Sequence, residues 1–100
     1  MQNFRTLTLA ASLYRATKSA PLSGDIKDQL VRAASSCCLN LAEGRGRGTL
    51  KDQLRFFHIA LGSLRECQAV LLIEDLKGSE LWCLADKCGA SIYRLIERAT

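Results

Sequence analysis

The residues best suited to binding chemistry are an alternating run, Gly-Arg-Gly-Arg-Gly, at positions 44–48. Arginines on a turn beside the start of a helix suit phosphate, because a guanidinium group bonds two oxygens at once and the first amides of a helix are unpaired. The spacing differs from GxGxxG and GxxxxGK[ST], so we expect no mononucleotide site. The run indicates contact with a nucleic-acid backbone. The alternative is a flexible turn whose arginines are solvated or paired with Glu43 or Glu66.

Positive charge is spread unevenly along the chain. The formal net charge is +4, but residues 1–20 and 44–58 each carry +3, whereas residues 21–43 and 59–100 each carry −1. A concentrated basic surface is typical of proteins that bind a polyanion. We therefore predict that seven basic side chains contact nucleic acid: Arg45, Arg47, Lys51, Arg55, Arg5, Arg15 and Lys18.

Polar residues at helical spacing form a second constellation, on the two segments that flank the glycine-arginine run. Separations of three and four residues place each set on one helix face, and a short turn brings the two faces together. This pattern favours a buried polar network that fixes helix register, with Arg32 or Arg47 neutralising a carboxylate. Catalysis by paired carboxylates is the alternative, but a di-metal bundle needs Glu-x-x-His pairs, which the chain lacks. The predicted network comprises Ser36, Asn40, Glu43, Ser63, Glu66 and Arg32.

Other candidates for catalysis or metal binding have weak patterns. His58 is the only histidine, and its spacing identifies no nucleophile beside it. Cys83 and Cys88 are separated by four residues, whereas structural zinc sites use closer pairs and four ligands. Phe56 and Phe57 could stack on bases, but their helical spacing favours core positions. We therefore expect no catalytic residue, no metal, no cofactor and no enzymatic activity.

Composition predicts one compact domain spanning residues 1–100, because the hydrophobic fraction is 48% and there is only one proline. The longest apolar run, residues 69–73, is far shorter than the roughly 20 residues that cross a bilayer. Residues 7–13 continue into a helical pattern without a cleavage site. We expect a cytoplasmic protein without membrane contact. Five cysteines, two of them adjacent at positions 37 and 38, favour reduced core side chains over disulfides.

Four helices must position these residues. The first is predicted at about residues 3–19, before Pro21. Its apolar positions form two stripes, Phe4, Leu7, Ala11 and Tyr14, and Leu9, Leu13 and Ala16. The second helix begins at or just after Ser23, and Gly44 is expected just past its end because glycine reaches left-handed backbone conformations easily. The third covers about residues 50–76 after Thr49 as its N-cap, and Ser79 opens the fourth.

Short connections between four helices favour an all-α, antiparallel up-down-up-down four-helix bundle. The first and third predicted helices carry apolar residues on more than one face, and Trp82 is expected to be exposed. Large unpaired apolar surface marks an interface between molecules. We therefore expect a homo-oligomer.

Residues 21–66 contain a specific combination of small, polar and apolar residues: Gln29, Arg32-Ala33-Ala34, Ser36, Asn40-Leu41-Ala42-Glu43-Gly44, Gly46-Arg47, Phe56, Ile59-Ala60 and Gly62-Ser63-Leu64-x-Glu66. This combination resembles the pattern of the 23S rRNA intervening-sequence proteins, also called the S23 or four helix bundle protein family. The resemblance extends more loosely over almost the whole chain. Cys38 departs from the pattern, because the family usually has proline there, and a helix kink would be lost.

The resemblance implies a ring-like homopentamer that binds nucleic acid. Members are encoded inside rRNA intervening sequences, and relatives, the accessory variability determinants of diversity-generating retroelements, assist a reverse transcriptase. We predict a non-enzymatic, oligomeric protein that contacts the backbone of RNA or of an RNA–DNA hybrid, with a reverse transcriptase or ribonucleoprotein as a further partner. The alternative is a protein–protein adaptor whose basic surface docks on an acidic or ribonucleoprotein partner.

Overall fold

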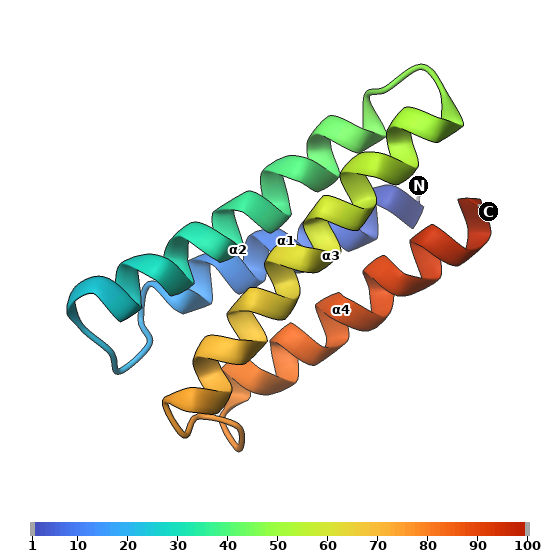
Figure 1. The fold of residues 1–100 in the computed structure, drawn as a ribbon. Coiled ribbons are helices and arrows are strands. Elements are labelled where there is room, and N and C mark those ends of the chain that lie inside the picture. The colour runs from blue at the N-terminus through green and yellow to red at the C-terminus, as the bar shows by residue number, and fades with distance from the viewer. Residues whose placement is uncertain (1, 100) are drawn as a thin grey trace.

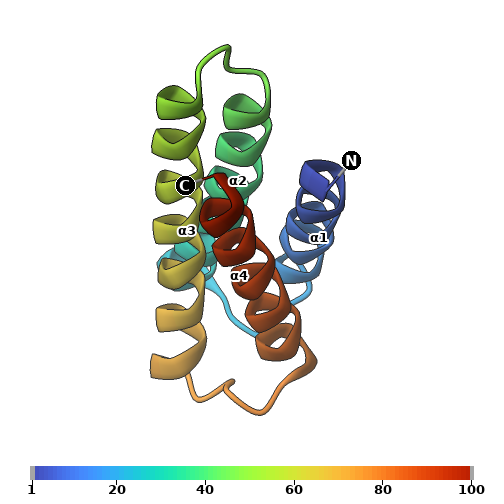
Figure 2. The same cartoon turned by 90° about the vertical axis from the view of Figure 1, so that its right-hand side faces the viewer.

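The fold is built from helices alone. The computed structural model describes residues 2–99, in which α1 (Gln2–Thr17), α2 (Gly24–Arg45), α3 (Leu50–Ile73) and α4 (Glu80–Ala99) occur without any strand. Each helix contacts the next one along the chain, and α4 also contacts α1, so the helices form a closed ring (Figure 1 and Figure 2). The all-α prediction is confirmed, and this order of contacts is consistent with an up-down-up-down bundle.

The helix ends gather at two ends of the molecule. Figure 1 shows the start of α1, the turn between α2 and α3 and the end of α4 at one end, which we call the turn end. The connections from α1 to α2 and from α3 to α4 lie at the opposite end, which we call the loop end. Residues near position 5, position 47 and position 98 are therefore brought to the same end of the fold.

The core consists of apolar side chains from all four helices. They recur every three or four residues along each helix, which places them on one face. Removal of this apolar surface from water is the main force that holds the helices together. The side chains without any exposed surface include Ala10, Leu13, Leu30, Ala34, Cys37, Ala60, Leu64, Cys67, Leu71, Ala85, Cys88 and Ile92.

The buried face of α1 differs from the two predicted stripes, of which only Leu13 is fully buried. Thr6 and Thr17 occupy core positions because their hydroxyls find partners: Thr6 Oγ1 lies 2.7 Å from Ser91 Oγ, and Thr17 Oγ1 donates to the carbonyl oxygen of Tyr14 at 2.6 Å. A hydrogen-bonded hydroxyl avoids most of the cost of burial. The stripe prediction counted only apolar residues and was wrong for this reason. Of the other predicted positions, the Phe4 side chain lies outside the described residues, and the half-buried ones are Leu7, Leu9, Ala11, Tyr14 and Ala16.

Side-chain and backbone hydrogen bonds fix the helix boundaries. The predicted N-cap is confirmed, because Thr49 Oγ1 accepts from the backbone N–H of Asp52 at 3.2 Å. Ser79 similarly accepts from the backbone N–H of Trp82 at 3.2 Å. α3 ends at Ile73, earlier than predicted, because Asp75 adopts a left-handed φ of 62° and the next N–H bonds back to Leu71 O at 2.7 Å. This is the Schellman arrangement, formed here with aspartate in the usual place of glycine.

α3 carries more apolar residues than its core face needs. By length and composition alone it is the one helix among residues 2–99 that could cross a membrane, with a mean hydropathy of 1.3. Its buried residues pack against α2 and α4, as in a central helix of a bundle, whereas Ile59, Leu72 and Ile73 are exposed. Trp82 of α4, which we expected to be exposed, is half-buried against the core.

Candidate functional site

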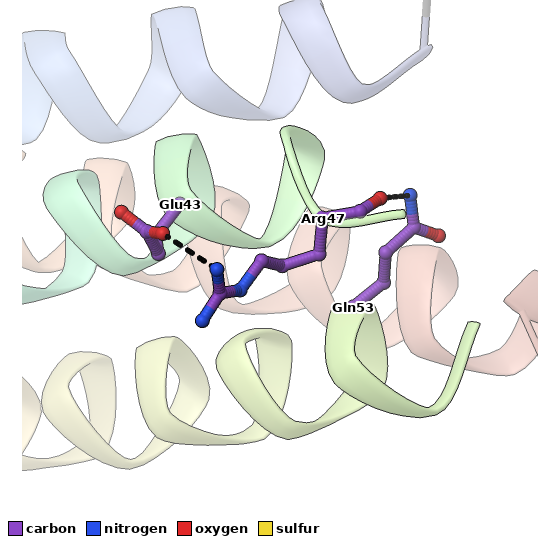
Figure 3. Close-up of polar contacts among 3 residues, drawn as sticks. All are labelled: Glu43, Arg47 and Gln53. Atoms are coloured by element: carbon purple, nitrogen blue, oxygen red, sulfur yellow. Dashed lines mark hydrogen bonds and ion pairs between the residues drawn. The ribbon is translucent and has the colours of Figure 1, made fainter. Parts of the chain in front are cut away.

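The glycine-arginine turn is held by hydrogen bonds. Gly46 N–H donates to Glu43 O at 3.1 Å, and Arg47 N–H donates to Gly44 O at 3.2 Å. The side-chain amide of Gln53 donates to Arg47 O at 3.3 Å, so α3 reaches back to the turn (Figure 3). These bonds fix the turn relative to the first residues of α3.

Gly44 does not lie past the end of α2, as its sequence suggested, but inside the helix. α2 continues to Arg45, and the C-cap residue Gly46 has φ −86°, outside the left-handed region. A Cβ atom on Gly44 would lie 2.8 Å from Phe57 Cε1 and 3.0 Å from Phe56 Cβ. The glycine is therefore needed for the close approach of α2 to α3, and not for backbone freedom.

Arg47 is partly engaged within the protein. Its Nη1 lies 3.5 Å from Glu43 Oε2, one helical turn away, as Figure 3 shows. The pairing with Glu43 that the sequence left open is thus present, and Glu66 makes no such pair within residues 2–99. Arg47 Nε is buried and has no hydrogen-bond partner among the described residues. The ion pair is exposed on both sides, so it adds little stability.

Phe56 holds two guanidinium groups at the turn end. The guanidinium carbons of Arg47 and Arg55 lie 4.8 and 4.4 Å from the centroid of its ring. Both distances are within the roughly 6 Å over which a cation is attracted to an aromatic ring. Arg45, at the end of α2, and Lys51, at the start of α3, are exposed beside them. Four of the predicted basic residues are therefore gathered on one small surface.

The three predicted basic residues of the N-terminal segment separate from one another. Arg5 lies near the start of α1, at the turn end, whereas Arg15 lies in its last turn and Lys18 follows it, at the loop end (Figure 1). A rise of about 1.5 Å per residue puts Arg5 and Arg15 roughly 15 Å apart along the helix axis. Lys18 Nζ instead lies 4.6 Å from the centroid of the Tyr14 ring. The seven predicted residues do not form one continuous surface.

Two arginines that the sequence did not single out join Arg5 at the turn end. Arg94 and Arg98 lie one turn apart on α4, and they line a pocket together with Arg5. The sequence concealed them because the acidic residues of segment 59–100 outnumber its basic ones, giving −1 overall. Their spacing of four residues, combined with the expected position of α4 beside α1, was the signal that could have found them.

The predicted polar network forms only in part. Ser36 Oγ lies 2.9 Å from Ser63 Oγ, and Asn40 Nδ2 donates to the carbonyl oxygen of Ser36 at 2.8 Å and to its hydroxyl at 3.2 Å. These three residues join α2 to α3, but they are half-buried, not fully buried. Glu43 pairs with Arg47 instead, which corrects its placement in the network. Arg32 and Glu66 line a neighbouring pocket without an ion pair to any described residue.

The cysteines are free thiols, and Cys37, Cys67 and Cys88 are fully buried as predicted. A hydrogen bond between the thiols of Cys37 and Cys88, together with burial, raises the pKa of Cys37 far above its ordinary value. Burial raises the pKa of Cys67 to about 12. Neutral thiols are weak nucleophiles, so these side chains serve as small core residues.

The remaining candidates show no arrangement suited to catalysis. His58 is exposed on α3, whereas Phe57 is buried in the core, as its spacing predicted. Within residues 2–99, no group of three or more His, Cys, Asp and Glu side chains is placed to hold a metal ion. The surface at the turn end is therefore the strongest candidate for binding.

Comparison with known proteins gives one match. A family model described as 23S rRNA-intervening sequence protein matches residues 4–80, which include α1, α2, α3 and the whole glycine-arginine turn apart from the first residues of α1. Neither the search of curated proteins nor the search of solved structures gave a match.

Proposed function

Because the chain belongs to the 23S rRNA-intervening sequence protein family, we propose that it is a non-enzymatic, oligomeric protein that binds nucleic acid through the turn end of its bundle. The ligand is the phosphate backbone of RNA or of an RNA–DNA hybrid. The observation that carries the proposal is the placement of Arg47 and Arg55 on the ring of Phe56, next to exposed Arg45 and Lys51. Charged groups that are held in place before binding lose less freedom when they contact phosphate.

Contacts of this kind set affinity more than sequence preference. Phosphate contacts position a protein on the strand but read no base, and each one releases counterions. Binding should therefore be strong at low ionic strength, weaken steeply with salt and vary little between sequences. Arg5 extends the same basic end, whereas Arg15 and Lys18 would have to contact nucleic acid on a second surface at the loop end.

The proposal includes the assembly of the molecule. We take the bundle to be antiparallel, up-down-up-down, and the protein to form a homopentamer, as the family resemblance implies. Support for self-association comes from large apolar side chains that the isolated chain leaves exposed, because such side chains are normally covered by a partner. They are Leu39, Leu50, Ile59, Leu72, Ile73 and Tyr93.

The same exposed apolar side chains support the second candidate function, a protein–protein adaptor with a basic docking surface. A reverse transcriptase or a ribonucleoprotein in the cytoplasm is the partner of either candidate. The two candidates differ in how they respond to nuclease. A partner that stays bound after complete digestion of RNA and DNA supports the adaptor, and one that is released supports nucleic-acid binding.

The test compares two double variants that each remove two positive charges. Arg45→Gln with Lys51→Gln changes the turn end, and Arg15→Gln with Lys18→Gln changes the loop end. Binding of a fluorescent single-stranded RNA is measured by anisotropy across a salt series. The turn-end variant should lose affinity, and its salt dependence should fall by about 2 in slope, about 1 for each phosphate contact. Equal losses in both variants, or none in the turn-end variant, would contradict the proposal.

A further inference from the structure

A pocket of about 330 Å³ lies between α1 and α4 at the turn end. Its volume is at the lower limit of ordinary ligand pockets, roughly 300–1,000 Å³. We call it the α1–α4 pocket, and its lining residues are Arg5, Thr6, Ser91, Arg94, Leu95 and Arg98. Arg94 and Arg98 lie outside the residues that the family model matches, so the pocket is not accounted for by that match.

The charge of the pocket is of one sign. Its walls carry three guanidinium groups and no carboxylate. Arg5 and Arg94 make no ion pair within the described part of the chain. Arginine stays protonated at any physiological pH, so the repulsion between these groups cannot be relieved by loss of a proton. Like charges four residues apart also destabilise a helix, which means that helix stability does not explain the pair Arg94 and Arg98.

Two hydroxyl groups lie beside these arginines. Thr6 and Ser91 are 3% and 7% exposed, and their hydroxyl oxygens are 2.7 Å apart, bridging α1 and α4. When Thr6 donates to Ser91, the hydroxyl hydrogen of Ser91 remains able to donate to a ligand oxygen. Guanidinium groups with a hydroxyl donor form the set of donors that binds a phosphate oxygen cluster.

We propose that the α1–α4 pocket binds one phosphate group of the nucleic-acid strand that contacts the glycine-arginine turn. This inference rests on the proposed function, and it adds a defined anion site to a basic surface. The start of α1 and the end of α4 lie at the same end of the molecule as the turn, so one strand can pass both (Figure 1 and Figure 2). Arg94 is the key residue, because it is exposed, unpaired within residues 2–99 and a turn away from the end of its helix.

The first experiment tests the pocket without nucleic acid. Thermal unfolding of the full chain is measured in potassium phosphate and in potassium chloride at equal ionic strength, for the wild type, for Arg94→Gln and for the control Arg65→Gln. Arg65 is exposed on α3 and bonds to Gln68, so the control removes the same charge elsewhere. Phosphate should raise the Tm of the wild type and the control more than chloride does, and this difference should be lost in Arg94→Gln. An equal phosphate effect in all three proteins would overturn the proposal.

The second experiment asks whether the phosphate belongs to a strand. Anisotropy with labelled single-stranded RNA should show that Arg94→Gln binds about ten-fold more weakly or worse, with a salt slope reduced by about 1, while Arg65→Gln binds as the wild type does. If Arg94→Gln binds RNA normally while the turn-end double variant does not, the pocket proposal is wrong and the proposed function stands. If the wild type itself binds no RNA at low salt, the proposed function has failed, and a phosphate effect would then indicate a site for free phosphate only.

Discussion

Glu43 and a bound phosphate compete for the guanidinium group of Arg47. The carboxylate lies 3.5 Å from that group and adds negative charge beside the turn. We predict that Glu43→Gln strengthens RNA binding at low salt by about two- to five-fold, the range of an exposed ion pair. The measurement is anisotropy with labelled RNA, and Glu80→Gln at the loop end is the control because it makes the same charge change far from the turn. Unchanged binding in Glu43→Gln would mean that Arg47 takes no part in the contact.

Gly44 and Gly62 both lie in helices but should respond to alanine with opposite signs. A Cβ atom on Gly44 would meet the buried ring of Phe57 at 2.8 Å, whereas one on Gly62 would meet nothing within 4 Å. Alanine normally stabilises a helix interior by about 0.5–1 kcal/mol relative to glycine, which is the expectation for Gly62→Ala. Gly44→Ala should instead lower the free energy of unfolding by about 1–3 kcal/mol because it overpacks the contact between α2 and α3. Chemical denaturation measures both, and a stable Gly44→Ala protein would show that the helices can separate without cost.

At the scale of the helices, the two N-caps provide a matched pair. Thr49 accepts a hydrogen bond from the first turn of α3, whereas Ser23, at the same position before α2, makes no side-chain cap bond. We predict that Thr49→Ala destabilises the protein by about 0.5–2 kcal/mol, because an amide of α3 loses its partner. Ser23→Ala should have a much smaller effect on the same denaturation curve. Equal effects would mean that the two caps differ in something other than this bond.

The sequence predicted the number and approximate position of the helices because apolar spacing and capping residues act locally. Thr49 and Ser79 mark helix starts by bonds to residues three positions away, so neighbouring letters suffice to find them. The errors occurred where distant contacts decide. Gly44 resembles a helix stop, but Phe57 determines its role, and Thr6 looks too polar for a core position until Ser91 is seen beside it.

At the scale of the whole molecule, the candidate site was predictable for the turn and not for the rest of the basic end. Arg45, Arg47, Lys51 and Arg55 are close in sequence and remain close in space. Arg5 and Arg94 meet only because α1 packs against α4, and a charge count over segment 59–100 hides Arg94 among acidic residues. Arg15 and Lys18 shared a segment with Arg5 but lie at the loop end, because a helix carries its residues apart along its axis.

Self-association and nucleic-acid binding should be linked through the number of basic ends in the assembly. Leu72 and Ile73 are 55% and 69% exposed at the end of α3, so charged residues there should leave the core intact. We predict that Leu72→Glu with Ile73→Glu lowers the mass measured by sedimentation, because carboxylates cannot be buried in an apolar interface without a partner. The smaller particle should also bind a long RNA more weakly, while binding of a short oligonucleotide stays nearly the same, because an assembly gains from several contacts at once.

A matched variant separates the loss of assembly from the change in charge. Glu74 and Asp75 already follow these residues, so Leu72→Gln with Ile73→Gln removes the apolar side chains without adding charge. If both variants lose mass and affinity for long RNA together, the exposed end of α3 is part of the interface and multivalent contact is what strengthens binding. If the mass is unchanged in both variants, the interface lies elsewhere on the bundle. If the mass falls but affinity for long RNA does not, each chain binds independently and the linkage between assembly and binding is wrong.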